Sequence, residues 1–168
     1  KDIPVDSFVL AKYGLGFDGM LHSYDCEQIL EADFEDLFIK HTNWSPRKAR
    51  PYVVKNSEEL EKKLTSDKVF VGVTATAGGF YGPQGRVLRI GLQDDALNSK
   101  IDNFEFKGVR VTNLEMETSA IYGLAKLLGH NACSMNAIIA NRANGTFSEN
   151  PYKPVEELIV YTLNKLVS

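Results

Sequence analysis

The chain has 168 residues, of which 43% are hydrophobic and 24% are charged, and its formal net charge is −3. This balance is that of an ordinary globular protein and excludes the fibrous and intrinsically disordered classes. A mildly acidic chain is poorly suited to non-specific binding of nucleic acids or anionic membranes. Because no apolar run reaches the roughly 20 residues that cross a bilayer, we expect neither a membrane nor a nucleic acid among its partners.

The cysteines and histidines give no sign of a disulfide framework or a metal centre. Cys26 and Cys133 are the two cysteines, and they lie far apart in the sequence. The three histidines are scattered, without the close spacing that zinc ligands need. We therefore expect reduced thiols, a cytoplasmic location, no metal site and no cofactor.

The first third of the chain mixes strand, loop and helix signals. Residues 3–11 are predicted as a strand, and three glycines over 14–19 predict a loop after it. Apolar residues recur at helical spacing over 26–40, which predicts a helix. Two prolines predict a loop at 43–51, and Ser57 is a candidate N-cap of a short helix. Because the chain opens Lys-Asp-Ile-Pro and soon enters a strand, we expect part of the sheet to precede it.

Strands and helices alternate in the rest of the chain. The strand at 68–76 is apolar on both faces, as in a central strand covered by helices on both sides. The elements that follow are a glycine-rich loop at 77–86, a short helix at 94–103, a strand at 109–114, a helix at 117–128, a strand at 131–140 and a helix from Pro154. This alternation predicts an α/β layered domain with a largely parallel sheet.

Ligands of such sheets bind at the carboxyl ends of the strands, so the loops there are the candidates for chemistry. Three loops qualify: residues 77–86, 115–117 and 141–149. Each contains charged or amide side chains.

Glu115, Met116 and Glu117 lie at the junction of a strand and a helix. Two carboxylates at this spacing can accept hydrogen bonds from a vicinal diol, and charge-assisted bonds are strong. A helix N-terminus also stabilises negative charge. Acidic residues are common in a first helical turn for that reason alone. The spacing by itself therefore favours the purely structural interpretation.

Phe80, Gln84 and Arg86 lie in the glycine-rich loop. Gln offers a donor and an acceptor and Arg a fork of donors, which together match a planar ring with carbonyl oxygens and an N–H on one edge. Phe80 could stack on that ring. The alternative is a surface loop with an exposed arginine. A phosphate cradle at the Gly-Gly pair is disfavoured, because no helix follows directly to present its N–H groups.

Asn141 and Arg142 follow the last predicted strand. A second arginine at a strand end could order a loop or hold a carbonyl group of a ligand. A salt bridge on the rim of the sheet is the competing interpretation.

Together these motifs resemble the nucleoside phosphorylase superfamily, and most closely its uridine phosphorylases. Asn113-Leu-Glu-Met-Glu-Thr-Ser-Ala120 is similar to the ribose-binding signature of the superfamily. The stretch Gly72-Val-Thr-Ala-Thr76, with Phe80-Tyr81, Gln84 and Arg86, is similar to the base-binding stretch of uridine phosphorylases. Ile138-Ile-Ala-Asn-Arg142 resembles the strand and turn that follow in that family. The three motifs agree in order and spacing over nearly the whole chain, and residues 23–56 fit least well.

The resemblance implies a three-layer α/β/α fold with a mixed, largely parallel central sheet, incomplete at its N-terminus. Residues 1–168 would form the C-terminal part of a single nucleoside phosphorylase domain. The implied ribose contacts are Glu115, the Met116 backbone and Glu117, and the implied base contacts are Phe80, Gln84, Arg86 and Arg142. Arg86 and Glu117 would carry the catalysis.

The resemblance further implies phosphorolysis of uridine to uracil and ribose 1-phosphate, with phosphate as co-substrate and no cofactor. Purine-specific relatives typically carry an Asp after the last strand, where this chain reads Ala140-Asn141-Arg142, and this departure favours a pyrimidine. In the family the phosphate is held by a Gly-rich loop and arginines of the N-terminal half. We therefore expect those groups upstream or on another chain, and we expect this chain alone to be inactive. A homo-oligomer based on dimers, up to a hexamer, is also implied.

Three kinds of function remain open from the sequence. The first is an enzyme, either a uridine phosphorylase or a purine phosphorylase or nucleosidase of the same superfamily. The second is a nucleoside-binding module without turnover. The third is an assembly fragment with no ligand of its own.

Overall fold

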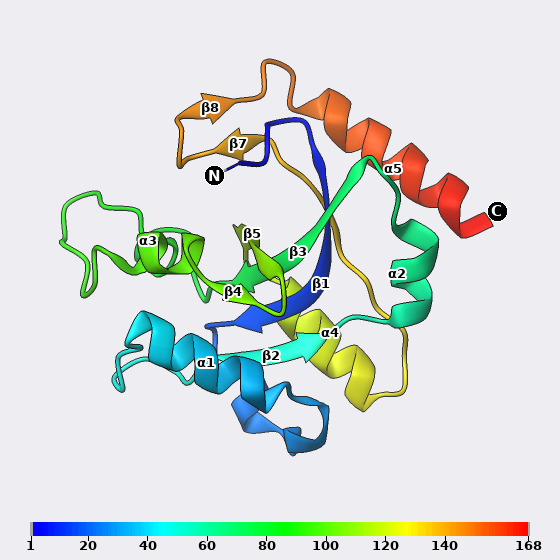
Figure 1. Cartoon of the computed structure of the whole chain (residues 1–168). Coiled ribbons are helices and arrows are strands. Elements are labelled where there is room, and N and C mark those ends of the chain that lie inside the picture. Colours follow the sequence, from blue (N-terminus) through cyan, green and yellow to red (C-terminus); the bar gives the residue numbers. More distant parts are fainter. Residues whose placement is uncertain (1, 168) are drawn as a thin grey trace.

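The computed structural model describes residues 2–167 of the chain. Within them, six strands form one mixed sheet in which β2, β1, β3, β5 and β4 are neighbours in that order, and β6 pairs with β1 (Figure 1). The strands span Phe8–Gly16 (β1), Tyr52–Lys55 (β2), Val69–Thr76 (β3), Glu105–Phe106 (β4), Val109–Glu115 (β5) and Met135–Ala137 (β6). A separate pair is formed by Ala140–Asn141 (β7) and Thr146–Phe147 (β8).

The three central strands β1, β3 and β5 run parallel to one another. Antiparallel partners flank them, because β2 and β6 pair with β1, and β4 pairs with β5. The predicted α/β fold with a mixed sheet and a parallel centre is confirmed. The carboxyl ends of β1, β3 and β5 therefore meet at one edge of the sheet.

Helices cover both faces of the sheet. The helices span Ala32–Thr42 (α1), Glu58–Leu64 (α2), Leu97–Asp102 (α3), Thr118–Leu127 (α4) and Tyr152–Val167 (α5). On one face α1 and α3 pack with Tyr13 and Leu15 of β1 in a core rich in aromatic rings. On the other face Tyr122 of α4 packs with Ala11 and Tyr52. The sheet is thus the middle layer of an α/β/α sandwich.

The prediction of a strand at 3–11 followed by a loop is wrong in its boundaries. β1 continues through Gly14 and Gly16, which face α4. A Cβ atom on Gly14 would lie 2.8 Å from the Ser119 Cα, and one on Gly16 would lie 2.2 Å from the Tyr52 ring. Because these glycines have no side chain, α4 and the buried Tyr52 ring can pack directly against the strand. The two glycines therefore belong to the sheet and do not end it.

The region 26–56 also differs from the predictions. The predicted helix at 26–40 is a short 3₁₀ turn at Glu27–Ile29 followed by α1. The two are separated because Leu30 forms an isolated bridge with Val54. Strand β2 was not predicted, since its four residues follow the proline-containing loop directly. The predicted cap of α2 is confirmed, and the Ser57 hydroxyl accepts the N–H of Leu60.

The C-terminal third corrects two further predictions. Of the strand expected at 131–140, only β6 pairs in the main sheet, where it runs antiparallel to β1, and Ala140 already begins β7. Helix α5 begins at Tyr152, two residues before Pro154, and buries Pro154 and Leu158. Within residues 2–167 no helix is long and apolar enough to cross a membrane.

Cys26 and Cys133 are both free thiols, as the sequence predicted. Burial raises the pKa of the Cys133 thiol to about 11. A thiol with so high a pKa carries little thiolate at neutral pH and is unreactive.

Candidate functional site

Two predicted site segments begin side by side, where β3 and β5 end. Thr76 and Glu115 are partners in the parallel register of the two strands. The Ala77 N–H donates to the Glu115 carbonyl at 2.9 Å, which carries the pairing one residue further. From this point the chain forms the β5–α4 turn (residues 115–118) and the β3–α3 loop (residues 77–96).

Within the β5–α4 turn, the Glu115 carboxylate is committed to the protein itself. Its Oε1 accepts the Thr76 hydroxyl at 2.7 Å. Its Oε2 accepts the N–H groups of Glu117 and Thr118 at 2.8 Å each, and the Thr118 hydroxyl at 3.0 Å. Glu115 therefore satisfies two donors at the start of α4 that have no partner inside the helix. The structural interpretation of this glutamate is the one that its contacts support.

Glu117 occupies a different environment in the same turn. Its side chain is exposed, and its Oε2 accepts the Met116 N–H at 3.2 Å. A backbone donor and a carboxylate acceptor thus lie next to each other at the surface. Each hydroxyl of a diol is both a donor and an acceptor, so this pair can bind two neighbouring hydroxyls. Of the two glutamates, Glu117 is the one free to do so.

Sequence reasoning missed a buried hydrogen-bonded chain beneath this turn. The Ser119 N–H donates to the Thr76 hydroxyl at 2.9 Å. The Ser119 hydroxyl lies 2.9 Å from the Tyr52 hydroxyl, which in turn donates to Asp18 Oδ1 at 2.6 Å. Burial and the Asp18 bond raise the pKa of Tyr52, so it stays protonated and serves as a donor. The partners are 34 to 67 residues apart in sequence, and no local pattern could have revealed them.

The predicted base-binding residues are brought together in the β3–α3 loop. The Arg86 guanidinium lies over the Phe80 ring, with 3.7 Å between Cζ and the ring centroid. Its Nη1 donates to Gln84 Oε1 at 2.7 Å and also to the Phe80 carbonyl. Arg142 reaches the same place from β7, and its Nη2 donates to the Gln84 carbonyl at 3.2 Å. A single turn of 3₁₀ helix at Gly82–Gln84 shapes this part of the loop.

The two guanidinium groups give this loop a local positive charge in a chain of net charge −3. Although the Arg142 side chain reaches the surface, partial burial lowers its pKa, and the nearby Arg86 charge lowers it further. Arg142 nevertheless remains cationic at neutral pH, because an arginine pKa lies far above it. Donors with positive charge suit a planar group that carries, or acquires, negative charge.

Asn141 is directed elsewhere. Its Nδ2 donates to the Ile3 carbonyl at 2.9 Å, and its Oδ1 accepts the Ala143 N–H at 3.1 Å. The side chain thus ties the β7 turn to the start of the chain. Of the pair after the last predicted strand, Arg142 is the residue that touches the β3–α3 loop.

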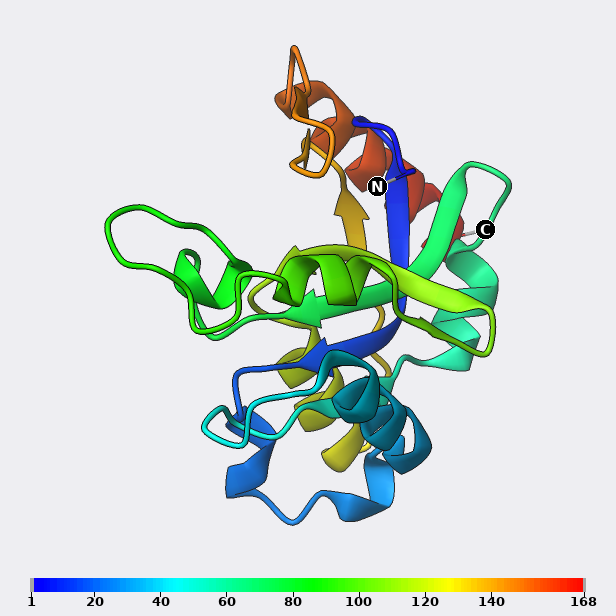
Figure 2. The ribbon, with the colours of Figure 1, turned by 60° about the vertical axis from the view of Figure 1, so that its left-hand side comes forward.

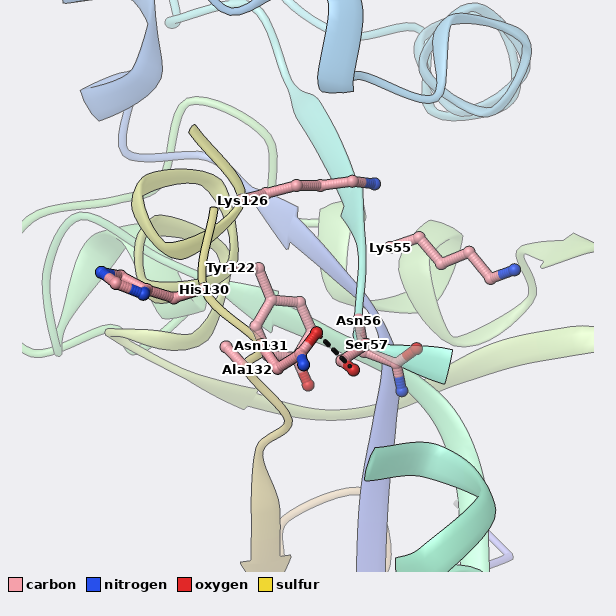
Figure 3. Close-up of a pocket in the computed structure, with 8 residues that line it drawn as sticks. All are labelled: Lys55, Asn56, Ser57, Tyr122, Lys126, His130, Asn131 and Ala132. Carbon is pink, nitrogen blue, oxygen red and sulfur yellow. Dashed lines mark hydrogen bonds between the residues drawn. The ribbon is translucent and has the colours of Figure 1, made fainter. Parts of the chain in front are cut away.

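Two hollows of the surface lie away from these residues. One of about 90 Å³ lies at the C-terminal end of α4, with Tyr122, Lys126 and His130 on one side and residues 55–57 on the other (Figure 3). A more open hollow of about 560 Å³ lies between α5 and the start of β1. The candidate site is instead an open surface at the strand ends. Among residues 2–167, His, Cys, Asp and Glu side chains form no cluster that could hold a metal ion.

Comparisons with known proteins agree on the family. The family model described as "Phosphorylase superfamily" matches residues 1–166. A uridine phosphorylase of Thermococcus kodakarensis is 34% identical over 79 residues, which cover 47% of this chain and 28% of that protein.

Solved structures agree on the fold. A Trypanosoma brucei nucleoside phosphorylase, described as showing uridine phosphorylase activity, aligns with 99% of this chain at a TM-score of 0.83 and 22% identity. A uridine phosphorylase structure from the oomycete Phytophthora capsici aligns with all of it at a TM-score of 0.65 and 20% identity. The chain covers 59% and 61% of the lengths of these two structures.

Proposed function

Because the chain belongs to the phosphorylase superfamily, we propose that it serves the phosphorolysis of uridine to uracil and ribose 1-phosphate. In this proposal Glu117 and the Met116 N–H bind the ribose hydroxyls. Phe80, Gln84, Arg86 and Arg142 bind the uracil. Phosphate is the co-substrate, and we assign no phosphate-binding residue among residues 2–167.

The observation that carries the proposal is the convergence of Arg86 and Arg142 on Gln84, in a loop that begins beside the β5–α4 turn. Arg86 bonds the Gln84 side chain and Arg142 bonds its carbonyl. The loop leaves β3 at Ala77, which is hydrogen-bonded to Glu115. A donor-rich edge for a ring and an acceptor for a diol therefore extend from one point of the sheet, as a nucleoside requires.

This arrangement suits the charge changes of phosphorolysis. As the glycosidic bond lengthens, the sugar gains positive charge and the departing uracil gains negative charge. The Glu117 carboxylate on the sugar side favours the first change. The Arg86 guanidinium on the base side favours the second, because donors aimed at developing charge are a large catalytic term. A departing uracil whose carbonyl oxygens are stabilised in this way needs no separate general acid.

The choice of uridine over a purine nucleoside rests on two supports. Arginine and glutamine donors fit the carbonyl oxygens of uracil, and Asn141 stands where purine-specific relatives typically carry an Asp. The Thermococcus kodakarensis relative is named a uridine phosphorylase, which favours the same substrate.

The test is the release of uracil from uridine by the protein as it is made in the cell, followed by ultraviolet absorbance with and without phosphate. We expect uracil only when phosphate is present. Release without phosphate would indicate a nucleosidase, and cleavage of inosine or adenosine instead of uridine would overturn the pyrimidine assignment. Binding of uridine without any cleavage would indicate that the protein is a nucleoside-binding module and not an enzyme.

A further inference from the structure

The hydroxyl of Thr76 lies at the junction of β3, β5 and α4, and the residue is completely buried. It donates to Glu115 Oε1 at 2.7 Å and accepts the Ser119 N–H at 2.9 Å. A threonine hydroxyl has a single proton, so its one donor is used on Glu115. Thr76 thus bonds the residue just before Met116–Glu117 and the residue two positions after them.

The same contacts control the start of α4. The backbone N–H groups of Glu117 and Thr118 donate to Glu115, and that of Ser119 donates to Thr76. Three groups that a helix N-terminus leaves unpaired are therefore satisfied by two strand-end side chains. Because Glu115 is itself held by Thr76, the direction of the turn depends on that hydroxyl.

The helix start is in turn fixed against β1. A Cβ atom on Gly14 would meet the Ser119 Cα at 2.8 Å, so strand and helix are in direct contact there. The Ser119 hydroxyl is bonded to Tyr52, which is anchored on Asp18. The position of Ser119 is therefore fixed by β1 and Tyr52, and Thr76 links Glu115 to Ser119.

From this geometry we propose that Thr76 is a positioning residue for nucleoside recognition, which sets the Met116 N–H and the Glu117 carboxylate in place before the ribose binds. The inference rests on the proposed function, in which these two groups bind the ribose diol. Groups that are held in their binding geometry lose less conformational entropy on binding. Thr76 would therefore act on affinity for the sugar without touching it.

Thr74 provides a matched control on the same strand. It is equally buried, and its hydroxyl donates to Asn113 Oδ1 at 2.8 Å on the same neighbouring strand. It has the same residue type and burial as Thr76, but its bond lies outside the β5–α4 turn. Thr74→Val therefore removes a comparable bond without releasing Glu115.

The first experiment uses the ligand-free chain and measures amide hydrogen exchange by nuclear magnetic resonance. Thr76→Val should speed exchange at the Glu117, Thr118 and Ser119 amides by about tenfold, the effect of losing one hydrogen bond to a charged group. Thr74→Val should leave these amides unchanged, and Thr76→Ser should restore the wild-type rates. Unchanged exchange in Thr76→Val would overturn the positioning role, whatever the chain binds.

The second experiment compares affinity for uridine and for 2′,3′-dideoxyuridine, which lacks the diol. Thr76→Val should reduce the preference for uridine by about tenfold, while Thr74→Val keeps the wild-type preference. Equal losses for both nucleosides would show a merely structural residue and overturn the inference. If the wild-type chain itself shows no preference, the ribose assignment of the proposed function fails, and the positioning role for the ribose fails with it.

Discussion

The β5–α4 turn and the β3–α3 loop belong to one candidate site but are built in opposite ways. The turn is short, and Glu115 alone accepts four hydrogen bonds from the protein. The loop extends away from the sheet, as the green segment in both ribbon views shows (Figures 1 and 2). Val87, Leu88 and Ile90 in it are 60%, 74% and 83% exposed. The conformation of the turn is thus fixed by the protein itself before any ligand binds. The conformation of the loop depends on a few contacts around Gln84.

This difference fits the two halves of a nucleoside. Ribose is common to all ribonucleosides and can be bound by a rigid turn whose conformation is set by the core. The base distinguishes them, and a loop outside the core can change its residues without disturbing the fold. Substitutions in the turn should therefore cost stability and ribose affinity, whereas those in the loop should cost base recognition and turnover alone.

The largest expected effect is that of Arg86→Ala on the rate of uracil release. Removing a donor aimed at developing negative charge should lower kcat by roughly 100- to 1000-fold. Thermal unfolding should be little changed, because the side chain lies in the exposed loop. Arg89→Ala is the control in the same loop and should retain nearly full activity. Equal losses in the two variants would mean that the loop as a whole, not Arg86, carries the effect.

Gly16→Ala should have the next largest effect, now on the free energy of unfolding. The new methyl would lie 2.2 Å from the Tyr52 ring and 2.7 Å from the Ser119 hydroxyl. Overpacking of this kind costs about 1–3 kcal/mol, which urea unfolding would measure. Gly91→Ala in the loop has no atom within 4 Å of its Cβ and should stay within about 0.5 kcal/mol of wild type. Similar values for both would remove the proposed contrast between the packed core beneath the turn and the open loop.

Glu117→Gln tests whether Glu117, and not Glu115, is the glutamate that binds the ribose. Loss of the charge should weaken uridine binding by about tenfold, because hydrogen bonds to charged groups are stronger than those between neutral groups. Binding of 2′,3′-dideoxyuridine should hardly change, which calorimetry of both ligands would establish. Glu156→Gln on the exposed side of α5 is the matched control. A variant that weakens both nucleosides alike would place Glu117 outside the ribose site.

The smallest expected effect concerns Glu35, a buried residue of α1 that accepts the Val53 N–H at 3.0 Å beside Tyr52. Burial raises the pKa of this carboxyl above its ordinary 4.5, against the opposing effects of the Val53 bond and Arg50. The folded state then holds the proton more tightly than the unfolded state, so this group lowers stability as pH rises above about 4.5.

Glu35→Gln should therefore gain stability relative to wild type as the pH increases from 4.5 to 8, by about 1 kcal/mol at most. Urea unfolding of both proteins across that range isolates the contribution of this residue. A difference that does not depend on pH would show that Glu35 ionises normally in the folded chain.

The place of the candidate residues in the fold could be predicted from the sequence, because they come in short local motifs. Glu115, Met116 and Glu117 lie where a strand was expected to meet a helix, and Phe80, Gln84 and Arg86 lie in a loop marked by glycines. Both segments are found at the carboxyl ends of neighbouring parallel strands, as expected. The purely apolar sequence of β3 also predicted a central strand correctly.

What could not be predicted depends on contacts between distant residues. In the sequence alone, Gly16 indicates the end of a strand. Only the structure shows that α4 packs directly against it. Thr76 is an ordinary strand residue in the sequence, and its partner Glu115 is 39 positions away. The different environments of Glu115 and Glu117 likewise depend on which carboxylate the fold has already hydrogen-bonded, and no spacing rule contains that information.

The most direct test of the central claim is a map of the backbone amides that uridine protects from hydrogen exchange in this chain. We expect protection at Met116–Thr118 and in residues 80–86, the two segments that would hold the sugar and the base. Protection confined to residues 55–57 and 126–132, around the cavity of Figure 3, would contradict the account and move the nucleoside site to the opposite end of α4.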